Sequence, residues 1–205
     1  APEVRIDLPE PGEVRVTLLD ASTGKTIPFG WVRWSPEWKG LGQGWAQSLE
    51  VDRETGTVAL LAPPGTHHAD IGADGYLAGE RTLSFVAGAT GELKVALRQA
   101  AVLVVRLKVD GKPFEGVAEV QAELKVDEKE LGRLSGESET GGVVTAQSGI
   151  SRNGEVRLDG LWGGPHEITV TRLAGVGPVA PRRVALRFGC VTEGELELVR
   201  SRGEA

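Results

Sequence analysis

Four tryptophans, which lie within fifteen positions of one another, are the residues best suited to bind a ligand: Trp31, Trp34, Trp38 and Trp45. The alternation around them predicts that Trp34 faces a core and Trp31 faces outward. Trp38 and Trp45 fall in a glycine-rich loop over residues 35–48, and long loops on rigid scaffolds commonly hold function. Exposed indoles offer a flat apolar face to a sugar ring and an N–H to a hydrogen bond. The candidate ligand-binding residues are therefore Trp31, Trp38 and Trp45, for a glycan or a protein partner, with packing over the domain edge as the structural alternative.

Three histidines and two aspartates are the residues that could ligate a metal ion. His67 and His68 are neighbours, and a strand would point them to opposite faces, so one ion cannot take both ligands from one face. His166 occupies the matching position in the second half of the chain. Asp70 and Asp74 lack the dense Asp-x-Asp-x-Asp-Gly pattern and the distal Glu of a calcium loop. We expect no metal site and no cofactor.

The chain offers little for nucleophilic catalysis. Its single cysteine, Cys190, cannot form an internal disulfide and has no histidine close to it in the sequence. The run 184–191 is typical of a strand, so we predict a buried, inert thiol. The sequence contains no Gly-x-Ser-x-Gly nucleophile elbow, and no pair of carboxylates is set apart from solvated strand faces. We therefore expect a protein that is not an enzyme.

The composition limits the classes of protein to which the chain can belong. The chain has 205 residues, of which 40% are apolar and 25% charged, and its formal net charge is −6. An acidic balance argues against nucleic acid as a partner, because neutralising phosphates requires a basic face. No apolar run approaches the roughly 20 residues that span a bilayer. These numbers indicate a soluble globular protein without a membrane span.

The elements that must position these residues are strands. Apolar and polar residues alternate clearly over 14–18, 103–109 and 120–126, which is the pattern of half-buried antiparallel strands. Turn pairs separate the runs, above all Asp-Gly at 110–111 and Asn-Gly at 153–154, which suit two-residue hairpins. Short strands at such spacing predict an all-β sandwich architecture.

Internal similarity predicts two domains. Three segments of the first half match three of the second in the same order: 14–20 with 104–110, 56–60 with 154–158, and 91–95 with 194–198. The offsets grow from 90 to 98 to 103 residues, as insertions in the loops of the second copy would require. We therefore predict two tandem antiparallel β-sandwiches, over residues 12–99 and 101–200.

Residues 1–11 stand outside the repeat. Val4, Ile6 and Leu8 alternate with polar residues until two prolines end the pattern. This segment is predicted to be an N-terminal arm or edge strand on the first domain. The alternative is a strand donated to a neighbouring subunit, because an extended segment can complete an exposed sheet edge. A protein partner or self-assembly through this segment is therefore one of our expectations.

Several motifs of the first domain resemble one known family. They are Thr-Gly-Lys at 23–25, Pro-Pro-Gly-Thr at 63–66 and Ala-Asp-Gly-Tyr at 73–76. Together they are similar to the carboxypeptidase regulatory-like, or transthyretin-like (prealbumin-like), β-sandwich family. The second domain keeps the framework with weaker hallmarks, Gly-Gly-Pro-His at 163–166 and Leu-Ala-Gly-Val at 173–176.

The resemblance implies an immunoglobulin-like sandwich and a non-catalytic role. Such modules are attached to exported enzymes, adhesins and envelope proteins, so we expect a structural or interaction module of an exported or cell-envelope bacterial-type protein. Inference from fold to function is analogy. The family's hydroxyisourate hydrolases end in a Tyr-Arg-Gly-Ser-type tail, whereas the only tyrosine here is Tyr76. Lys–Asn isopeptide bonds of pilin-type relatives are not expected either, because the only asparagine, Asn153, falls in a predicted turn.

Overall fold

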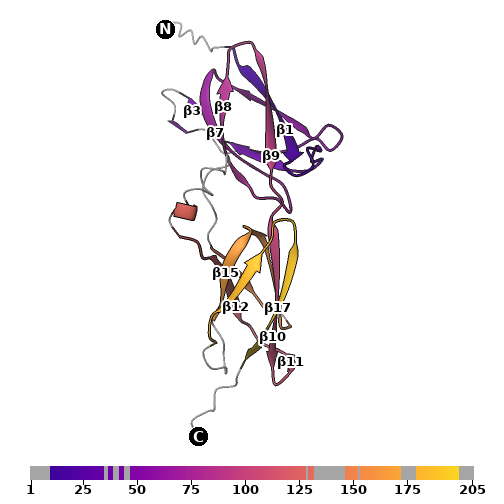
Figure 1. Cartoon of the computed structure of the whole chain (residues 1–205). Coiled ribbons are helices and arrows are strands. Elements are labelled where there is room, and N and C mark those ends of the chain that lie inside the picture. Colours follow the sequence, from indigo (N-terminus) through magenta and orange to yellow (C-terminus); the bar gives the residue numbers. More distant parts are fainter. Residues whose placement is uncertain are drawn as a thin grey trace. The chain divides into compact units, whose positions relative to one another are not determined.

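The protein is almost entirely β-structure (Figure 1). The computed structural model describes residues 10–34, 37–38, 42–43, 47–127, 129–131, 146–151, 153–171 and 179–198. In these residues the backbone forms strands and turns, with a single helical turn at 129–131. No helix in the described part of the chain is long and apolar enough to cross a membrane.

The chain divides into two compact units. Among the described residues, the first unit contains those within 10–74 and 78–97, and the second contains 75–77 and those within 98–198. We call them the first and the second sandwich. Because each has its own pair of sheets, each is described by itself below.

The first sandwich has two sheets. The three-stranded sheet has the order β6-β1-β9 and the four-stranded sheet the order β5-β2-β7-β8. A short pair, β3 and β4, lies in the chain between β2 and β5. The bounds are β1 Gly12–Asp20, β2 Trp31–Trp34, β3 Glu37–Trp38, β4 Gly42–Gln43, β5 Gln47–Glu50, β6 Thr57–Ala62, β7 Gly65–Gly72, β8 Gly79–Phe85 and β9 Thr90–Leu97.

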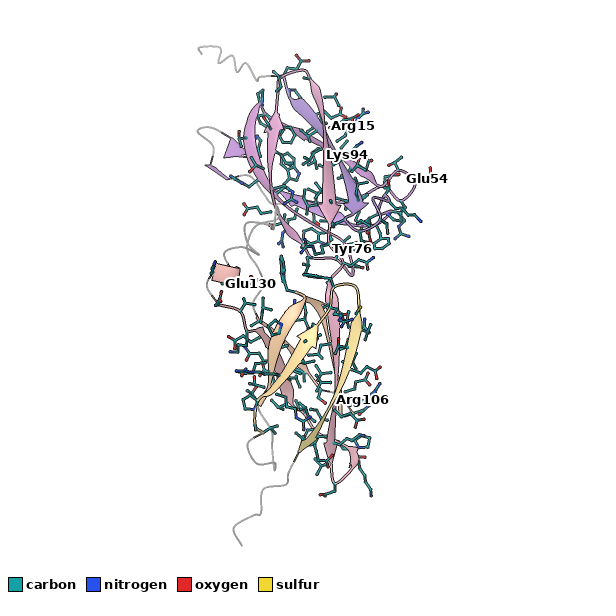
Figure 2. All side chains as sticks on the ribbon, in the orientation of Figure 1. Arg15, Glu54, Tyr76, Lys94, Arg106 and Glu130 are labelled. Atoms are coloured by element: carbon teal, nitrogen blue, oxygen red, sulfur yellow. The ribbon has the colours of Figure 1, made fainter. Side chains whose placement is uncertain are left out.

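Alternation along β1 builds the first core as expected. Val14, Val16 and Leu18 are buried between the sheets, with at most 4% of their surface exposed. Burying a side chain of this kind contributes roughly 1.5–3 kcal/mol to folding. On the outer face of the same sheet, Arg15 of β1 and Lys94 of β9 project into solvent (Figure 2). The sequence of β1 contains no lysine.

The second sandwich repeats this plan. One sheet joins β11 and β14 to one side of β10 and β17 to the other, and the second sheet has the order β13-β12-β15-β16. Its core includes the fully buried side chains of Leu103, Val105 and Leu107. The bounds are β10 Ala101–Val109, β11 Lys112–Pro113, β12 Glu119–Leu124, β13 Ala146–Ile150, β14 Glu155–Leu161, β15 Gly164–Thr171, β16 Arg182–Leu186 and β17 Val191–Leu198.

The predicted fold class, two tandem β-sandwiches, is confirmed, with one difference in strand direction. Most pairs are antiparallel, but the first and last strands of each sandwich pair in parallel, β1 with β9 and β10 with β17. Alternation reports only which face of a strand is buried, so it does not distinguish a parallel neighbour from an antiparallel one. Parallel neighbours need a long connection, which the intervening strands of each sandwich provide.

Backbone hydrogen bonds correct the predicted offset between the first strands of the two sandwiches. The amide of Leu18 donates to the carbonyl of Gly56, and the amide of Leu107 donates to the carbonyl of Gly154. Leu18 therefore corresponds to Leu107, an offset of 89 residues instead of 90. Because side chains alternate with a period of two, a shift of one residue exchanges the buried and solvent faces. The predicted offset would have matched Val16, which faces the core, with Arg106, which lies on the solvent face of β10.

Of the two predicted hairpin turns of the second sandwich, the one at 110–111 is confirmed, because β10 and β11 pair across it. The one at 153–154 is a turn but not a hairpin, because β13 before it and β14 after it belong to different sheets. Asp110 and Gly111 have φ values of 53° and 73°, and Asn153 and Gly154 have values of 56° and 77°. In both turns the two residues are in the left-handed region, which in the hairpin at 110–111 is the type I′ conformation. The prediction that Asn153 lies in a turn is thus confirmed. Of the predicted N-terminal arm, residues 1–9 lie outside the described residues, and β1 begins at Gly12.

Candidate functional site

Trp31 lies on the outer face of the four-stranded sheet of the first sandwich. Its neighbours on β2, Val32 and Trp34, face the core, with 0% and 4% of their surface exposed. Trp31 itself is half-buried. The orientation of these residues follows the predicted alternation, because β2 presents residues 31 and 33 on one face and 32 and 34 on the other.

Two contacts fix the indole of Trp31. Gly72 of β7 lies directly opposite Trp31 in the register, and a Cβ atom on Gly72 would stand 2.6 Å from the indole Cζ2. The absence of a side chain at residue 72 therefore leaves the space that the indole fills. The guanidinium of Arg33 stands 5.7 Å from the centre of the Trp31 ring, close enough for a cation–π contact. Arg33 also forms an ion pair with Asp70, with Nη2 and Oδ2 3.0 Å apart.

A recess of about 230 Å³ opens beside Trp31. Phe29 is its most exposed aromatic side chain, with 46% of its surface exposed, while Val51 is buried. The recess is formed where the loop before β2 meets the end of β5 and the turn after β7. Its lining residues are Phe29, Gly30, Trp31, Glu50, Val51, Arg53 and Asp74.

The charged side chains of the recess differ from their neighbours in having no ion-pair partner among the described residues. Glu50, Arg53 and Asp74 make no side-chain hydrogen bond or ion pair with any other residue that the structure describes. On the adjoining sheet surface, by contrast, His68 lies 3.3 Å from Glu80, and Arg33 pairs with Asp70. Two carboxylates and one guanidinium thus remain available beside two aromatic rings. Such groups can hydrogen-bond the hydroxyls of a bound ligand, or pair with charges on a partner protein.

Of the three predicted ligand-binding tryptophans, the structure places Trp31 at the recess. Trp38 lies on β3, where its backbone pairs with Gly42 of β4. Trp45 lies outside the described residues. The sequence reasoning missed Phe29, Glu50, Arg53 and Asp74, which come from separate loops. Their only sequence signal was the position of Phe29 just before the tryptophan cluster.

The histidines are structural in character. His67 and His68 point to opposite faces of β7, as predicted: His67 is 3% exposed, whereas His68 faces solvent. The Nε2 atom of His67 lies 3.0 Å from the carbonyl oxygen of Pro63. The ring also stands edge-on to Trp34 and Phe85, with centroids 6.1 and 5.2 Å away. These contacts make His67 part of an aromatic cluster in the core.

His166 is the corresponding buried histidine of the second sandwich. It is 1% exposed, and its Nδ1 atom lies 3.2 Å from the carbonyl oxygen of Gly164. Burial lowers the pKa of His166 because the charged imidazolium loses its hydration, although the contact with Gly164 partly opposes this effect. Within the described ranges, no group of three or more His, Cys, Asp and Glu residues is arranged to hold a metal ion.

The prediction for Cys190 is wrong. The thiol is exposed instead of buried, and the residue lies in the turn between β16, which ends at Leu186, and β17, which begins at Val191. The predicted strand over 184–191 is interrupted by a turn that contains Gly189, whose φ is 67°. The backbone carbonyl of Cys190 accepts a hydrogen bond from the amide of Val102 at the start of β10.

Comparisons with known proteins find similar chains only among solved structures. No protein-family profile matches the chain, and no curated protein matches its sequence. The similar structures include the Streptococcal ancillary pilin (12% identity, TM-score 0.47, 94% of this chain and 63% of that one). A minor pilin of Streptococcus agalactiae shares 11% identity at a TM-score of 0.48, with 95% and 98% coverage. The shaft pilin SpaA of Lactobacillus rhamnosus GG shares 11% identity at 0.40, with 94% and 98% coverage. These values assign no activity, and the fold class rests on the strand pairing described above.

Proposed function

We propose that the chain is a non-catalytic structural or interaction module of an exported or cell-envelope protein. The observation that carries this proposal is the common plan of the two sandwiches: the same strand order, the same parallel pair of first and last strands, and interiors built of apolar side chains. The proposal includes two tandem copies of one unit, over residues 12–99 and 101–200, with residues 1–11 as an arm.

The proposal also includes a relationship of both sandwiches to the carboxypeptidase regulatory-like family, which the motifs that resemble this family support. Gly24 has a φ of 69° in the turn after β1, and Gly65 has a φ of 144° at the start of β7. In the second sandwich Gly164 stands at the start of β15 with a φ of 134°. Glycine at these positions adopts backbone conformations that other residues avoid. The weaker hallmark at 163–166 thus falls where its counterpart falls in the first sandwich, while the one at 173–176 lies outside the described residues.

Two measurements test the proposed function. The purified chain should show no turnover on a broad panel of ester, glycoside, peptide and phosphate substrates. Turnover that survives repurification and is abolished by one polar substitution would contradict the non-catalytic role. For location, protease treatment of intact source cells should remove the signal of an antibody against the chain, while a cytosolic control protein persists. Complete protection from the protease would contradict an exposed envelope position.

The recess beside Trp31 favours glycan binding as a second candidate function. This candidate rests on the combination of the aromatic rings of Phe29 and Trp31 with the charged side chains of Glu50, Arg53 and Asp74, which have no ion-pair partner among the described residues. Aromatic faces and planar polar groups are the features that a sugar ring can use. The recess is smaller than the roughly 300–1,000 Å³ of ordinary ligand pockets, so it would hold about one ring of a longer glycan.

Glycan-array binding with matched variants tests this second function. Phe29→Ala combined with Trp31→Ala should abolish any array signal of the wild-type chain. Leu61→Ala is the control, because Leu61 is 64% exposed on β6 of the other sheet, so it removes exposed apolar surface away from the recess. Silence of the wild-type chain across the array, or binding that the double variant retains, would contradict glycan binding at this recess.

A further inference from the structure

In both sandwiches the first strand and the last strand are direct parallel neighbours. Eight residue pairs of β1 and β9 lie in register, from Glu13 opposite Thr90 to Asp20 opposite Leu97. Eight pairs of β10 and β17 do the same, from Val102 opposite Val191 to Val109 opposite Leu198. The chain thus enters each sandwich at one end of a ladder and leaves at the opposite end of the same ladder.

This geometry determines how tension on the chain would act. Force applied through the residues before β1 and after β9 pulls the two strands in opposite directions along their axes. The hydrogen bonds of a parallel ladder are evenly spaced, so they share a load of this kind and must break nearly together. If both attachment points lay at the same end of the ladder, the bonds would open one after another.

We propose that each sandwich is a mechanical clamp and that the chain bears tension along its length. This load-bearing role deepens the structural role proposed above and rests on it. It requires no ligand, catalytic group or covalent cross-link, because the resistance comes from the ladder between the first and last strands. Separating these strands also exposes buried residues on both of them, including Leu18 and Leu97 of the first sandwich.

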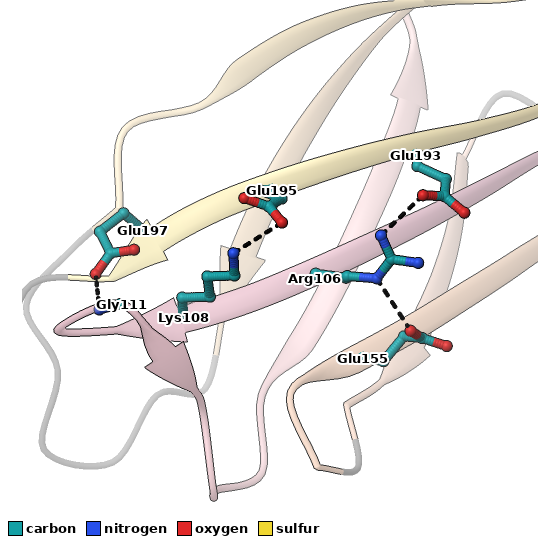
Figure 3. A network of polar contacts seen from close by, with 7 residues as sticks. All are labelled: Arg106, Lys108, Gly111, Glu155, Glu193, Glu195 and Glu197. Atoms are coloured by element: carbon teal, nitrogen blue, oxygen red, sulfur yellow. Dashed lines mark hydrogen bonds and ion pairs between the residues drawn. The ribbon is translucent and has the colours of Figure 1, made fainter.

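Side chains reinforce the ladder of the second sandwich across the sheared strands (Figure 3). Arg106 Nη1 lies 2.8 Å from Glu193 Oε2, and Lys108 Nζ lies 2.8 Å from Glu195 Oε1. The amide of Gly111, in the turn after β10, donates to Glu197 Oε1 at 2.9 Å. Each contact joins β10 or its following turn to β17. In the first sandwich, Arg15 of β1 pairs with Glu13 of its own strand, and it also lies opposite Glu92 of β9, whose negative charge attracts it.

Single-molecule force spectroscopy in two pulling geometries tests the clamp. In the first, the full chain is tethered by its N-terminus and by a cysteine added after residue 205, in a Cys190→Ser background. In the second, the same N-terminal tether is combined with the natural Cys190, which is exposed and precedes β17 directly. The first geometry shears the β10–β17 ladder, whereas the second pulls at the shared end of β10 and β17 and peels them apart.

The first sandwich is an internal reference, because both geometries load its β1–β9 ladder in shear. We expect its unfolding force to be the same in both. The unfolding force of the second sandwich should fall by a factor of about two or more in the peeling geometry, because few of its eight ladder pairs then carry the load at one time. In the peeling geometry the two sandwiches release nearly equal lengths of chain when they unfold. The Gly154→Ala substitution distinguishes the two events, because it destabilises the second sandwich alone and lowers only that unfolding force.

The outcomes separate this inference from the function on which it rests. Equal forces for the second sandwich in the two geometries would overturn the clamp while leaving a non-catalytic interaction module intact. Genuine turnover in the substrate panel would overturn the proposed function without changing the measured forces.

A variant pair tests the cross-ladder contacts. Arg106→Gln with Lys108→Gln should lower the shear force of the second sandwich and leave the peeling force and the first sandwich unchanged. The matched control is Arg157→Gln, which removes an exposed arginine of β14 that is paired with Asp159 of its own strand. Because Arg157 is not part of the β10–β17 ladder, this variant should leave the shear force of either sandwich unchanged. An unchanged shear force in the double variant would overturn the contribution of these contacts.

Discussion

The position of Trp31 depends on a residue that has no side chain. Gly72 lies opposite it on β7, and any Cβ there would fall within the space of the indole. The sequence indicated that Trp31 faces outward, because alternation is a local property. It could not show that Gly72, forty-one positions later in the chain, supplies the space, because that requires the β2–β7 register. The recess residues Glu50 and Asp74 were missed for the same reason.

Gly72→Ala should therefore move the indole and destabilise the first sandwich. Overpacking of this kind typically costs about 1–3 kcal/mol, and the changed surroundings of Trp31 should alter its fluorescence emission. Urea denaturation checks the free energy of unfolding. Gly91→Ala on β9 is the control, because its nearest non-neighbour atoms would be 3.8 Å from the new Cβ. Equal stabilities of the two variants would contradict the close packing of Trp31 on Gly72.

The exposed thiol of Cys190 leads to a simple labelling prediction. Because the side chain lies in a solvent-exposed turn, a thiol reagent such as DTNB should react with one equivalent per native chain without denaturant. The Cys190→Ser variant is the blank. Reaction only after unfolding would show that the thiol is buried, as the apolar pattern of 184–191 suggested.

His166 should make the second sandwich sensitive to mild acid. Because burial lowers its pKa in the folded state, the unfolded state binds more protons as the pH falls through the unfolded value of about 6.5. Stability is therefore fully present above that pH and declines below it. His166→Phe should flatten this decline between about pH 7.5 and 5.5, as measured by urea denaturation at each pH. An identical decline in the variant would assign it to other groups.

At the scale of elements, the turns and the buried face of each strand were more predictable from the sequence than the pairing between strands. The alternating run of β1 and the turn at Asn153 and Gly154 are local features, and both formed as expected. The register between the halves was not predictable, because Leu103, Val104 and Val105 are three consecutive apolar residues that fit either phase. The hydrogen bond from Leu107 to Gly154 and the register of β10 with β14 decide between the two phases.

The turn before β14 provides a test of this element. Gly154→Ala places a side chain at a φ of 77°, with its Cβ 2.8 Å from the backbone nitrogen of Phe114. Strain and crowding together should destabilise the second sandwich by about 1–3 kcal/mol. Gly194→Ala on β17, where nothing lies within 4 Å of the new Cβ, should be neutral or slightly stabilising. Denaturation of the two variants side by side checks this, and a neutral Gly154→Ala would contradict the assigned turn.

At the scale of the whole molecule, the sequence predicted two sandwiches from repetition but did not predict how each is closed. Strand periodicity carries no information on which strands become partners, so the parallel joining of first and last strands emerged only from the structure. That feature connects the fold to the force measurement. If the first and last strands of a sandwich paired in antiparallel, both attachment points would lie at the same end of the ladder, and tension would peel the strands apart instead of shearing them.

The pairing of first and last strands also determines when each sandwich can complete its folding during synthesis. Paired residues of β1 and β9 are 77 positions apart, and those of β10 and β17 are 89 apart. While a ribosome is still making the middle strands, one edge of β1 or β10 has no partner, and open strand edges invite association with other chains. A nascent sandwich therefore remains vulnerable until its final strand emerges, and messages truncated before β9 or β17 should yield aggregating fragments.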